Sequence, residues 1–124
     1  MTYLLVFFGG GLGAALRHGI NVAAFRLFGP AFPIGTLFIN VTGSFVMGLI
    51  AGYFALKGDL SQNWRLFLTT GILGGYTTFS AFSLDAILLW ERSETGLAIL
   101  YVAASVILSL VGLVLGLWIA RSFG

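Results

Sequence analysis

The sequence predicts an all-α integral membrane protein with four transmembrane helices. Hydrophobic residues make up 59% of its 124 residues and charged residues only 8%, whereas roughly 25% of an average soluble domain is charged. Four apolar stretches, separated by short segments that carry most of the charges, are each long enough for the about 20 residues that a membrane span requires. This shortage of charge argues against a soluble domain, a disordered chain or a nucleic-acid-binding protein. The absence of cysteine excludes disulfides and thiolate metal sites.

Residues 1–124 are predicted to form a single domain, in which charged residues and two prolines separate four spans. The apolar stretch after Met1 has neither a cationic start nor a small-residue cleavage site, so we interpret it as a mature helix rather than a signal peptide. Pro30 and Pro33 mark the first turn, because proline interrupts a helix. A hydrophilic segment at 57–63 and a charged turn at 91–94 mark the other two. The predicted spans are about 3–27, 34–56, 64–90 and 95–120.

The basic residues do not select an orientation in the membrane. Four spans place both termini on one side, together with Lys57, Arg65 and Arg121. Arg26 and Arg92 lie on the other side, with Arg17 if its side chain extends that way. The positive-inside rule therefore gives no preference. Either so few charges are uninformative, or the chain inserts both ways up and pairs as an antiparallel dual-topology homodimer.

Polar side chains inside the spans are the first candidates for function, because lipid offers them no hydrogen-bond partner. Thr36 and Asn40 share one face of the second span. Tyr101, Ser105 and Ser109 share one face of the fourth. A lone serine or threonine commonly bonds the carbonyl four residues earlier in its own helix. The Asn40 amide, with two donors and an acceptor, is harder to satisfy locally and so is a candidate for lining a pore or a site.

The third span contains a stretch that favours a broken helix near its middle. Gly74-Gly75-Tyr76-Thr77-Thr78 combines two glycines with an aromatic and two β-branched residues, all of low helix propensity. A break would free backbone groups at membrane depth, where they must be buried in protein or line a wet cavity. Broken membrane helices of this kind often form ion sites. The alternative is a helix that is merely kinked.

Two phenylalanines and few ionisable groups follow or flank this stretch. Phe79 and Phe82 share a helix face; they are either core and lipid-facing residues, or rings whose positive edges contact an anion. Arg17 is the candidate for attracting anions into a vestibule, with extension to the interface as the alternative. Asp85 is either solvated at the helix end or a partner of Arg17. The sequence contains no recognisable catalytic set, so an enzyme is not expected.

Three stretches together resemble the small fluoride channels of the Fluc/CrcB family. They are GGGLGAALR (9–17), GTLFINVTGSFVMG (35–48) and GGYTTFSAFS (74–83), and the resemblance covers essentially the whole chain. It implies a fluoride-selective channel in the cell membrane that passively exports fluoride from the cytoplasm and so protects against its toxicity. It also implies an antiparallel dual-topology homodimer in the lipid bilayer, with a structural sodium ion (Na+) that is not transported.

The resemblance also assigns roles to individual residues. It implies that the backbone carbonyls of Gly74 and Thr77 bind the sodium ion and that Arg17 lies at a vestibule. Asp85 stands where the family often has glutamate, and Tyr76 fills a variable position; both departures are mild. The implied pore-lining residues are Phe79, Phe82, Asn40, Thr36, Tyr101, Ser105 and Ser109.

Three other functions stay open at this point. A small four-span drug or cation antiporter would need a carboxylate deep in the membrane, but the first two spans contain no aspartate or glutamate. A cation channel could use the GGYTT backbone to conduct rather than to hold an ion. A non-transporting assembly subunit would pass no ion at all.

Overall fold

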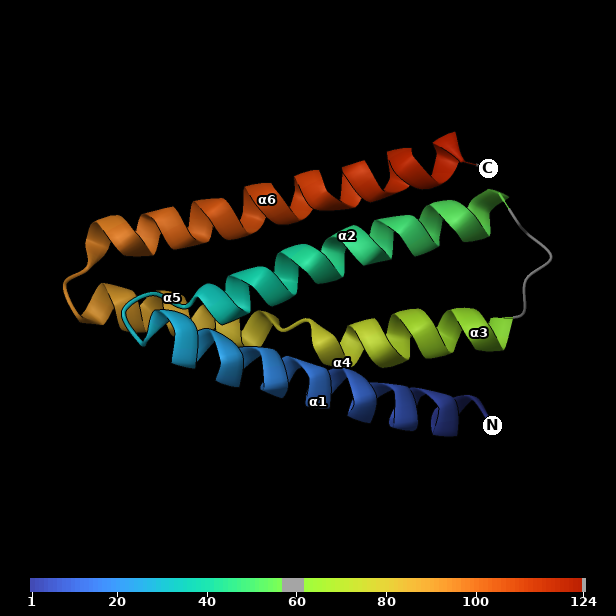
Figure 1. Ribbon diagram of the computed structural model, residues 1–124, viewed down its shortest axis with the longest axis horizontal. Coiled ribbons are helices and arrows are strands. Elements are labelled where there is room, and N and C mark those ends of the chain that lie inside the picture. The colour runs from blue at the N-terminus through green and yellow to red at the C-terminus, as the bar shows by residue number, and fades with distance from the viewer. Residues whose placement is uncertain (57–61, 124) are drawn as a thin grey trace.

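The protein is a bundle of long helices, and the computed structural model describes residues 1–56 and 62–123 (Figure 1). Within these residues, four helical stretches are long and apolar enough to cross a membrane. The elements confirm the predicted all-helical class, and the four apolar stretches are what a multi-pass membrane protein requires. Residues 57–61 of the predicted hydrophilic segment, with the Lys57 used in the charge comparison, lie outside the described residues. The elements are α1 (Thr2–Phe28), α2 (Ile34–Leu56), α3 (Gln62–Leu66), η1 (Phe67–Leu73), α4 (Gly74–Tyr76), α5 (Phe79–Glu91) and α6 (Thr95–Ser122).

The spans run up and down, so that both termini lie at one end of the bundle (Figure 1). The turn between α1 and α2 lies at the opposite end, as does the turn between α5 and α6. Gly29 ends α1 with a φ of 75°, a left-handed conformation that favours glycine, and its amide bonds the Phe25 carbonyl at 2.8 Å. Proline follows directly at position 30, where the chain cannot continue as helix.

Glycines set how closely the helices approach. A methyl group at Gly13 of α1 would overlap the Ile72 carbonyl of η1, and one at Gly48 of α2 would overlap the Leu113 carbonyl of α6. Small residues allow such backbone-to-backbone packing between membrane helices. The first and third spans therefore form one close pair, and the second and fourth form another.

The third span is not one continuous α-helix. Its first part is α-helical and then π-helical up to Leu73, and α4 adds a single turn that ends at Tyr76. Thr77 and Thr78 are extended, with ψ angles of 157° and 117°. The Thr78 hydroxyl then accepts a hydrogen bond from the Ala81 amide at 3.1 Å, which caps the start of α5. The chain thus interrupts and restarts its helix at GGYTT.

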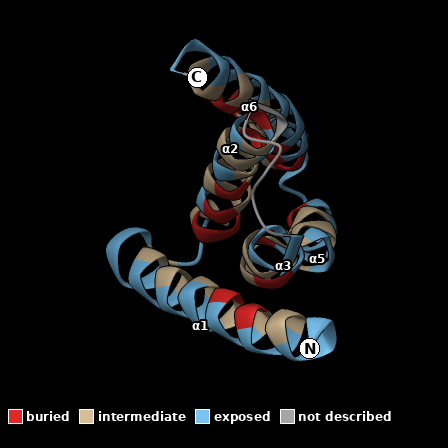
Figure 2. Cartoon of the chain, turned by 90° about the vertical axis from the view of Figure 1, so that its right-hand side faces the viewer, coloured by how far each residue is buried: buried red, intermediate tan, exposed pale blue. Residues whose placement is uncertain are grey.

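Burial is confined to the lines along which helices meet, and the outer faces are apolar (Figure 2). A small core at the end opposite the termini contains Leu89, Ala98 and Tyr101, with Phe32 and Phe82 packed against it. Large apolar side chains such as Phe7, Leu110 and Trp118 are exposed on the outside. Apolar exposure on this scale is expected of helices that face lipid or a second copy of the chain.

Candidate functional site

The extended segment of the third span is tied to α2 by one asparagine. The Asn40 Oδ1 atom accepts a hydrogen bond from the Thr78 amide at 2.8 Å. The Asn40 Nδ2 atom donates to the Thr78 carbonyl at 3.0 Å. This reciprocal pair satisfies both backbone groups of Thr78, which an interrupted helix would otherwise leave without partners inside the membrane. Asn40 therefore has a structural task as well as a place beside the cavity described below.

Arg17 contacts the same segment from the opposite helix. Its Nε atom donates to the Gly75 carbonyl at 3.1 Å, and the side chain is half-buried. The sequence left Asp85 as a possible partner for Arg17, but the structure gives Asp85 a different one, the Tyr101 hydroxyl at 3.3 Å. The vestibule role of Arg17 stays a prediction. In the structure, α1 and α2 hold the interrupted backbone from two sides.

The carbonyls of Gly74 and Thr77, which were predicted to bind a cation, lie where the third span is interrupted. In a continuous helix they would accept hydrogen bonds from the amides of Thr78 and Ala81, four residues later. Those two amides donate instead to the side chains of Asn40 and Thr78. The two carbonyls therefore lose their usual helical donors, and carbonyl oxygens are ligands that a hard cation prefers. The cation site itself stays a prediction. Within residues 1–56 and 62–123, no group of three or more His, Cys, Asp or Glu side chains offers an alternative metal site.

A cavity of about 360 Å³ lies beside the extended segment, between α2, α5 and α6. Thr77 and Thr78 form part of its wall. The remaining wall includes apolar residues of α6 such as Leu110. The cavity gathers five of the residues predicted to line a pore, namely Asn40, Phe79, Phe82, Ser105 and Ser109.

Ser105 is the unusual polar group in this cavity. Its side chain is only 6% exposed, and its hydroxyl has no hydrogen-bond partner within the described part of the chain. By contrast, the hydroxyls of Thr42 and Ser83 bond the carbonyls four residues earlier in their own helices. A buried hydroxyl without a partner is unfavourable by about 1–3 kcal/mol. Ser105 thus lines the cavity with a hydroxyl whose donor no described group uses.

Two aromatic rings, those of Phe79 and Phe82, line this cavity. The Phe79 and Phe82 ring centroids lie 5.5 Å apart, and those of Phe82 and Tyr101 lie 5.3 Å apart. Phe79 is 78% exposed on the surface of the single chain, whereas Tyr101 is completely buried. The three rings thus lead from the surface of the chain into its core.

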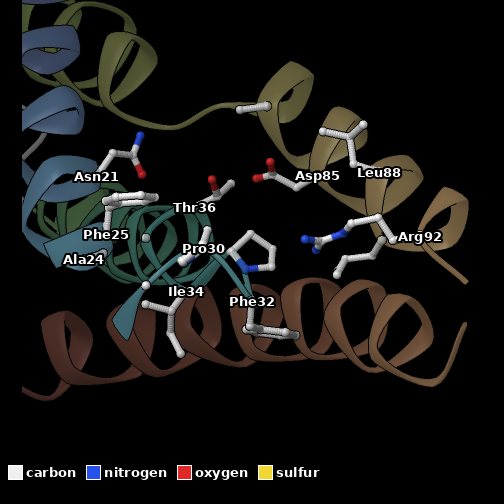
Figure 3. A pocket seen from close by; sticks show the side chains of 15 residues that line it. Asn21, Ala24, Phe25, Pro30, Phe32, Ile34, Thr36, Asp85, Leu88 and Arg92 are labelled. Carbon is white, nitrogen blue, oxygen red and sulfur yellow. The ribbon is translucent and has the colours of Figure 1, made fainter. Parts of the chain in front are cut away.

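A second cavity, of about 460 Å³, is lined by α1, the turn between α1 and α2, the start of α2, and α5 (Figure 3). Its polar lining comprises Asn21, Thr36, Asp85 and Arg92. In Figure 3 the Asp85 carboxylate points toward Thr36. Although Thr36 and Asn40 lie one helical turn apart on α2, they line different cavities.

Sequence reasoning did not identify some of the polar contacts around the interrupted segment. The Asn40–Thr78 pair is one, and a 2.8 Å contact between the Tyr76 and Thr42 hydroxyls is another. The available signal was chemical: a tyrosine hydroxyl in the middle of a span requires a partner. Which helix supplies that partner depends on how the spans pack.

Comparisons with known proteins agree with this architecture. Residues 4–117 match the family model described as "CrcB-like protein, Camphor Resistance (CrcB)". A protein of Rhodopseudomonas palustris (strain BisB5) named fluoride-specific ion channel FluC is 67% identical over 122 residues, 98% of each chain. FluC 2 of Nitrobacter hamburgensis is 63% identical over 121 residues, again 98% of each chain. FluC of Methylobacterium nodulans is 57% identical over all of this chain and 99% of its own. The chain belongs to the CrcB-like family.

Proposed function

We propose that this chain is a fluoride-selective ion channel of the plasma membrane, through which fluoride leaves the cytoplasm passively. Such export protects the cell against fluoride toxicity. The names of its relatives, fluoride-specific ion channels rather than enzymes, support this function. The structural observation that carries the proposal is a chain of contacts that joins two cavities: Phe82 in the wall of the first packs against Tyr101, whose hydroxyl contacts Asp85 in the wall of the second.

The proposed path runs from the cavity beside the extended segment, past the rings, into the cavity at the end of the bundle. Fluoride is small and strongly hydrated, so donors along the path must replace part of its water shell. The unpartnered Ser105 hydroxyl is one such donor, and Ser109 and the remaining N–H of Asn40 are others. Phe79 and Phe82 offer positive ring edges, and Thr36 and Tyr101 contribute hydroxyls at the far side. Contacts without a full charge are weak enough to let the ion leave.

Arg17 is the cation that we assign to the vestibule of this path. One nitrogen of its guanidinium is bound to the Gly75 carbonyl, and the group keeps its positive charge. A fixed positive charge near the entrance raises the local concentration of anions without lining the narrow part of the path. Arg17 would then serve both the interrupted backbone and the incoming ion.

We further propose that Gly74 and Thr77 hold a structural sodium ion that is not transported. The diversion of their helical amide donors supports this assignment. When bound, the cation would stabilise carbonyl dipoles that the interruption exposes. One chain supplies only two such oxygens, fewer than a hard cation prefers. A second copy related by a two-fold axis would double them, which supports an antiparallel dual-topology homodimer.

The test is ion efflux from proteoliposomes, measured with a fluoride electrode and, separately, a chloride electrode. We expect rapid fluoride efflux, little chloride efflux, and a loss of fluoride efflux when sodium is replaced by a bulky organic cation. Equal fluoride and chloride efflux would contradict the selectivity. Sodium flux through the protein would favour the alternative of a cation channel built on the GGYTT backbone, and no flux at all would favour an assembly subunit.

A further inference from the structure

Tyr76 occupies the last helical position before the extended segment, and its side chain reaches across to α2. Its hydroxyl lies 2.8 Å from the Thr42 Oγ1 atom, and both groups are partly buried. The two residues are 34 positions apart in the sequence. The contact therefore joins the second and third spans at the point where the third is interrupted.

The direction of this hydrogen bond follows from the other contacts of Thr42. The Thr42 hydroxyl lies 2.7 Å from the Phe38 carbonyl of its own helix, which can only accept a hydrogen bond. A hydroxyl has one proton, so Thr42 donates to Phe38 and accepts from Tyr76. The tyrosine ring meanwhile lies over Gly43, where an added methyl group would come within 3.2 Å of the Tyr76 Cδ2 atom.

One short stretch of α2 thus contacts both ends of the extended segment. Asn40 holds the backbone of Thr78 at the end of the segment, Thr42 holds the Tyr76 hydroxyl at its start, and Gly43 leaves space for the ring and for the Thr77 methyl group. The residues that need this support are the two glycines before Tyr76, because glycine leaves the backbone unusually free.

We propose that Tyr76 is a positioning residue whose hydroxyl, through Thr42, fixes the backbone of residues 74–78 in the form that exposes the Gly74 and Thr77 carbonyls. This inference rests on the sodium site proposed above. Tyr76 itself does not contact the ion. Its hydroxyl raises the fraction of protein molecules whose Gly74 and Thr77 carbonyls are positioned to bind sodium. Losing the hydroxyl therefore lowers the apparent sodium affinity without changing which anion passes.

The test compares the purified full-length wild type with Tyr76→Phe and Thr42→Val, each of which removes one side of the contact. Thr42→Ser keeps the accepting hydroxyl, and Tyr53→Phe removes a hydroxyl from the exposed face of α2. The first measurement is amide hydrogen exchange over residues 74–79 in sodium-free buffer. The second is the sodium concentration that gives half of the maximal thermal stabilisation.

In Tyr76→Phe and Thr42→Val we expect exchange about fivefold faster and a half-maximal sodium concentration about fivefold higher, the size of one neutral hydrogen bond. Thr42→Ser and Tyr53→Phe should behave as wild type. The double variant should be no worse than either single variant, because both remove the same bond.

Wild-type exchange in both Tyr76→Phe and Thr42→Val would overturn the positioning role, as would faster exchange with unchanged sodium binding. These results are distinguishable from failure of the proposed function. If the wild type shows no fluoride-selective efflux, the channel assignment fails, whereas hydrogen exchange still reports whether the Tyr76–Thr42 contact holds the segment.

Discussion

The third and fourth spans are similar in length but differ in continuity. The fourth, α6, is one uninterrupted helix from Thr95 to Ser122 although it contains three glycines and several hydroxyl side chains. The third changes from α-helix to π-helix and becomes extended at Thr77 and Thr78. Glycine and β-branched residues alone therefore do not interrupt a membrane helix.

The difference lies in what the neighbouring helices provide. Glycines of α6 bring its backbone against α2, where Gly116 meets the Phe45 carbonyl. The third span instead meets polar groups: Asn40 supplies an acceptor and a donor to Thr78, and Arg17 supplies a donor to Gly75. An interruption at membrane depth is stable where side chains replace the lost helical hydrogen bonds.

Substitution of Asn40 should have the largest effect on the interrupted third span. In Asn40→Leu, which keeps the number and branching of the side-chain heavy atoms, the backbone amide and carbonyl of Thr78 lose their partners. We expect the free energy of unfolding to fall by about 3 kcal/mol, from two unsatisfied buried groups, and fluoride efflux to be abolished. Thermal unfolding and proteoliposome efflux measure the two effects. Ser44→Ala, in the same helix and beside the same cavity, is the control; an Asn40→Leu protein as stable as this control would contradict the structural role.

Substitutions of Arg17 should have the next largest effect. They separate its contact with the Gly75 carbonyl from its proposed role as a positive charge at the vestibule. Arg17→Lys keeps the positive charge but cannot reproduce the Nε contact with Gly75. We expect a loss of stability of about 2 kcal/mol, as for a hydrogen bond to a charged group, with efflux retaining its dependence on ionic strength. Arg17→Met should lose both. If Arg17→Lys matched wild type in thermal unfolding, the contact with Gly75 would be incidental.

Substitutions of Phe82 and Phe79 test the proposed fluoride path rather than the interruption of the third span. Phe82 lines the cavity beside the extended segment and contacts Tyr101, whereas Phe79 is mostly exposed in the single chain. In Phe82→Ile we expect fluoride efflux to fall by up to about tenfold, because a ring contact worth about 1 kcal/mol and the ring edge are both lost. Phe79→Ile should have the smaller effect in the same efflux assay. An unaltered rate in Phe82→Ile would remove this ring from the path.

Substitution of Ser105 should change stability the least of these variants, and it should still slow fluoride efflux. Because its hydroxyl has no partner among the described residues, Ser105→Ala should leave stability unchanged or raise it by about 1 kcal/mol while slowing efflux severalfold. Ser83→Ala removes a hydroxyl that bonds its own helix and should leave efflux at the wild-type rate. Slower efflux in both variants would mean that the effect of Ser105 is not specific to the cavity.

Much of the architecture could be predicted without the structure. Four apolar stretches, separated by charges and by Pro30 and Pro33, were enough to predict an all-helical membrane protein with four spans. The GGYTT composition indicated where a helix would be weak. The contacts of Tyr76, Arg17 and Asp85 could not be predicted in the same way, because each partner lies on another span and helical spacing gives only the face of a residue's own helix.

The sequence alone determined that the chain forms four membrane-spanning helices. Its hydropathy and charge are set by its composition, and apolar segments of that length form helices in lipid because helices satisfy their own backbone hydrogen bonds. The tertiary structure decided which polar side chains hold the interrupted backbone. Thr36 and Asn40 share a face of α2 but line different cavities, because different segments complete the two walls: α1 and the turn after it in one, α6 in the other. Such a separation depends on contacts between spans, which the order of residues within one span does not specify.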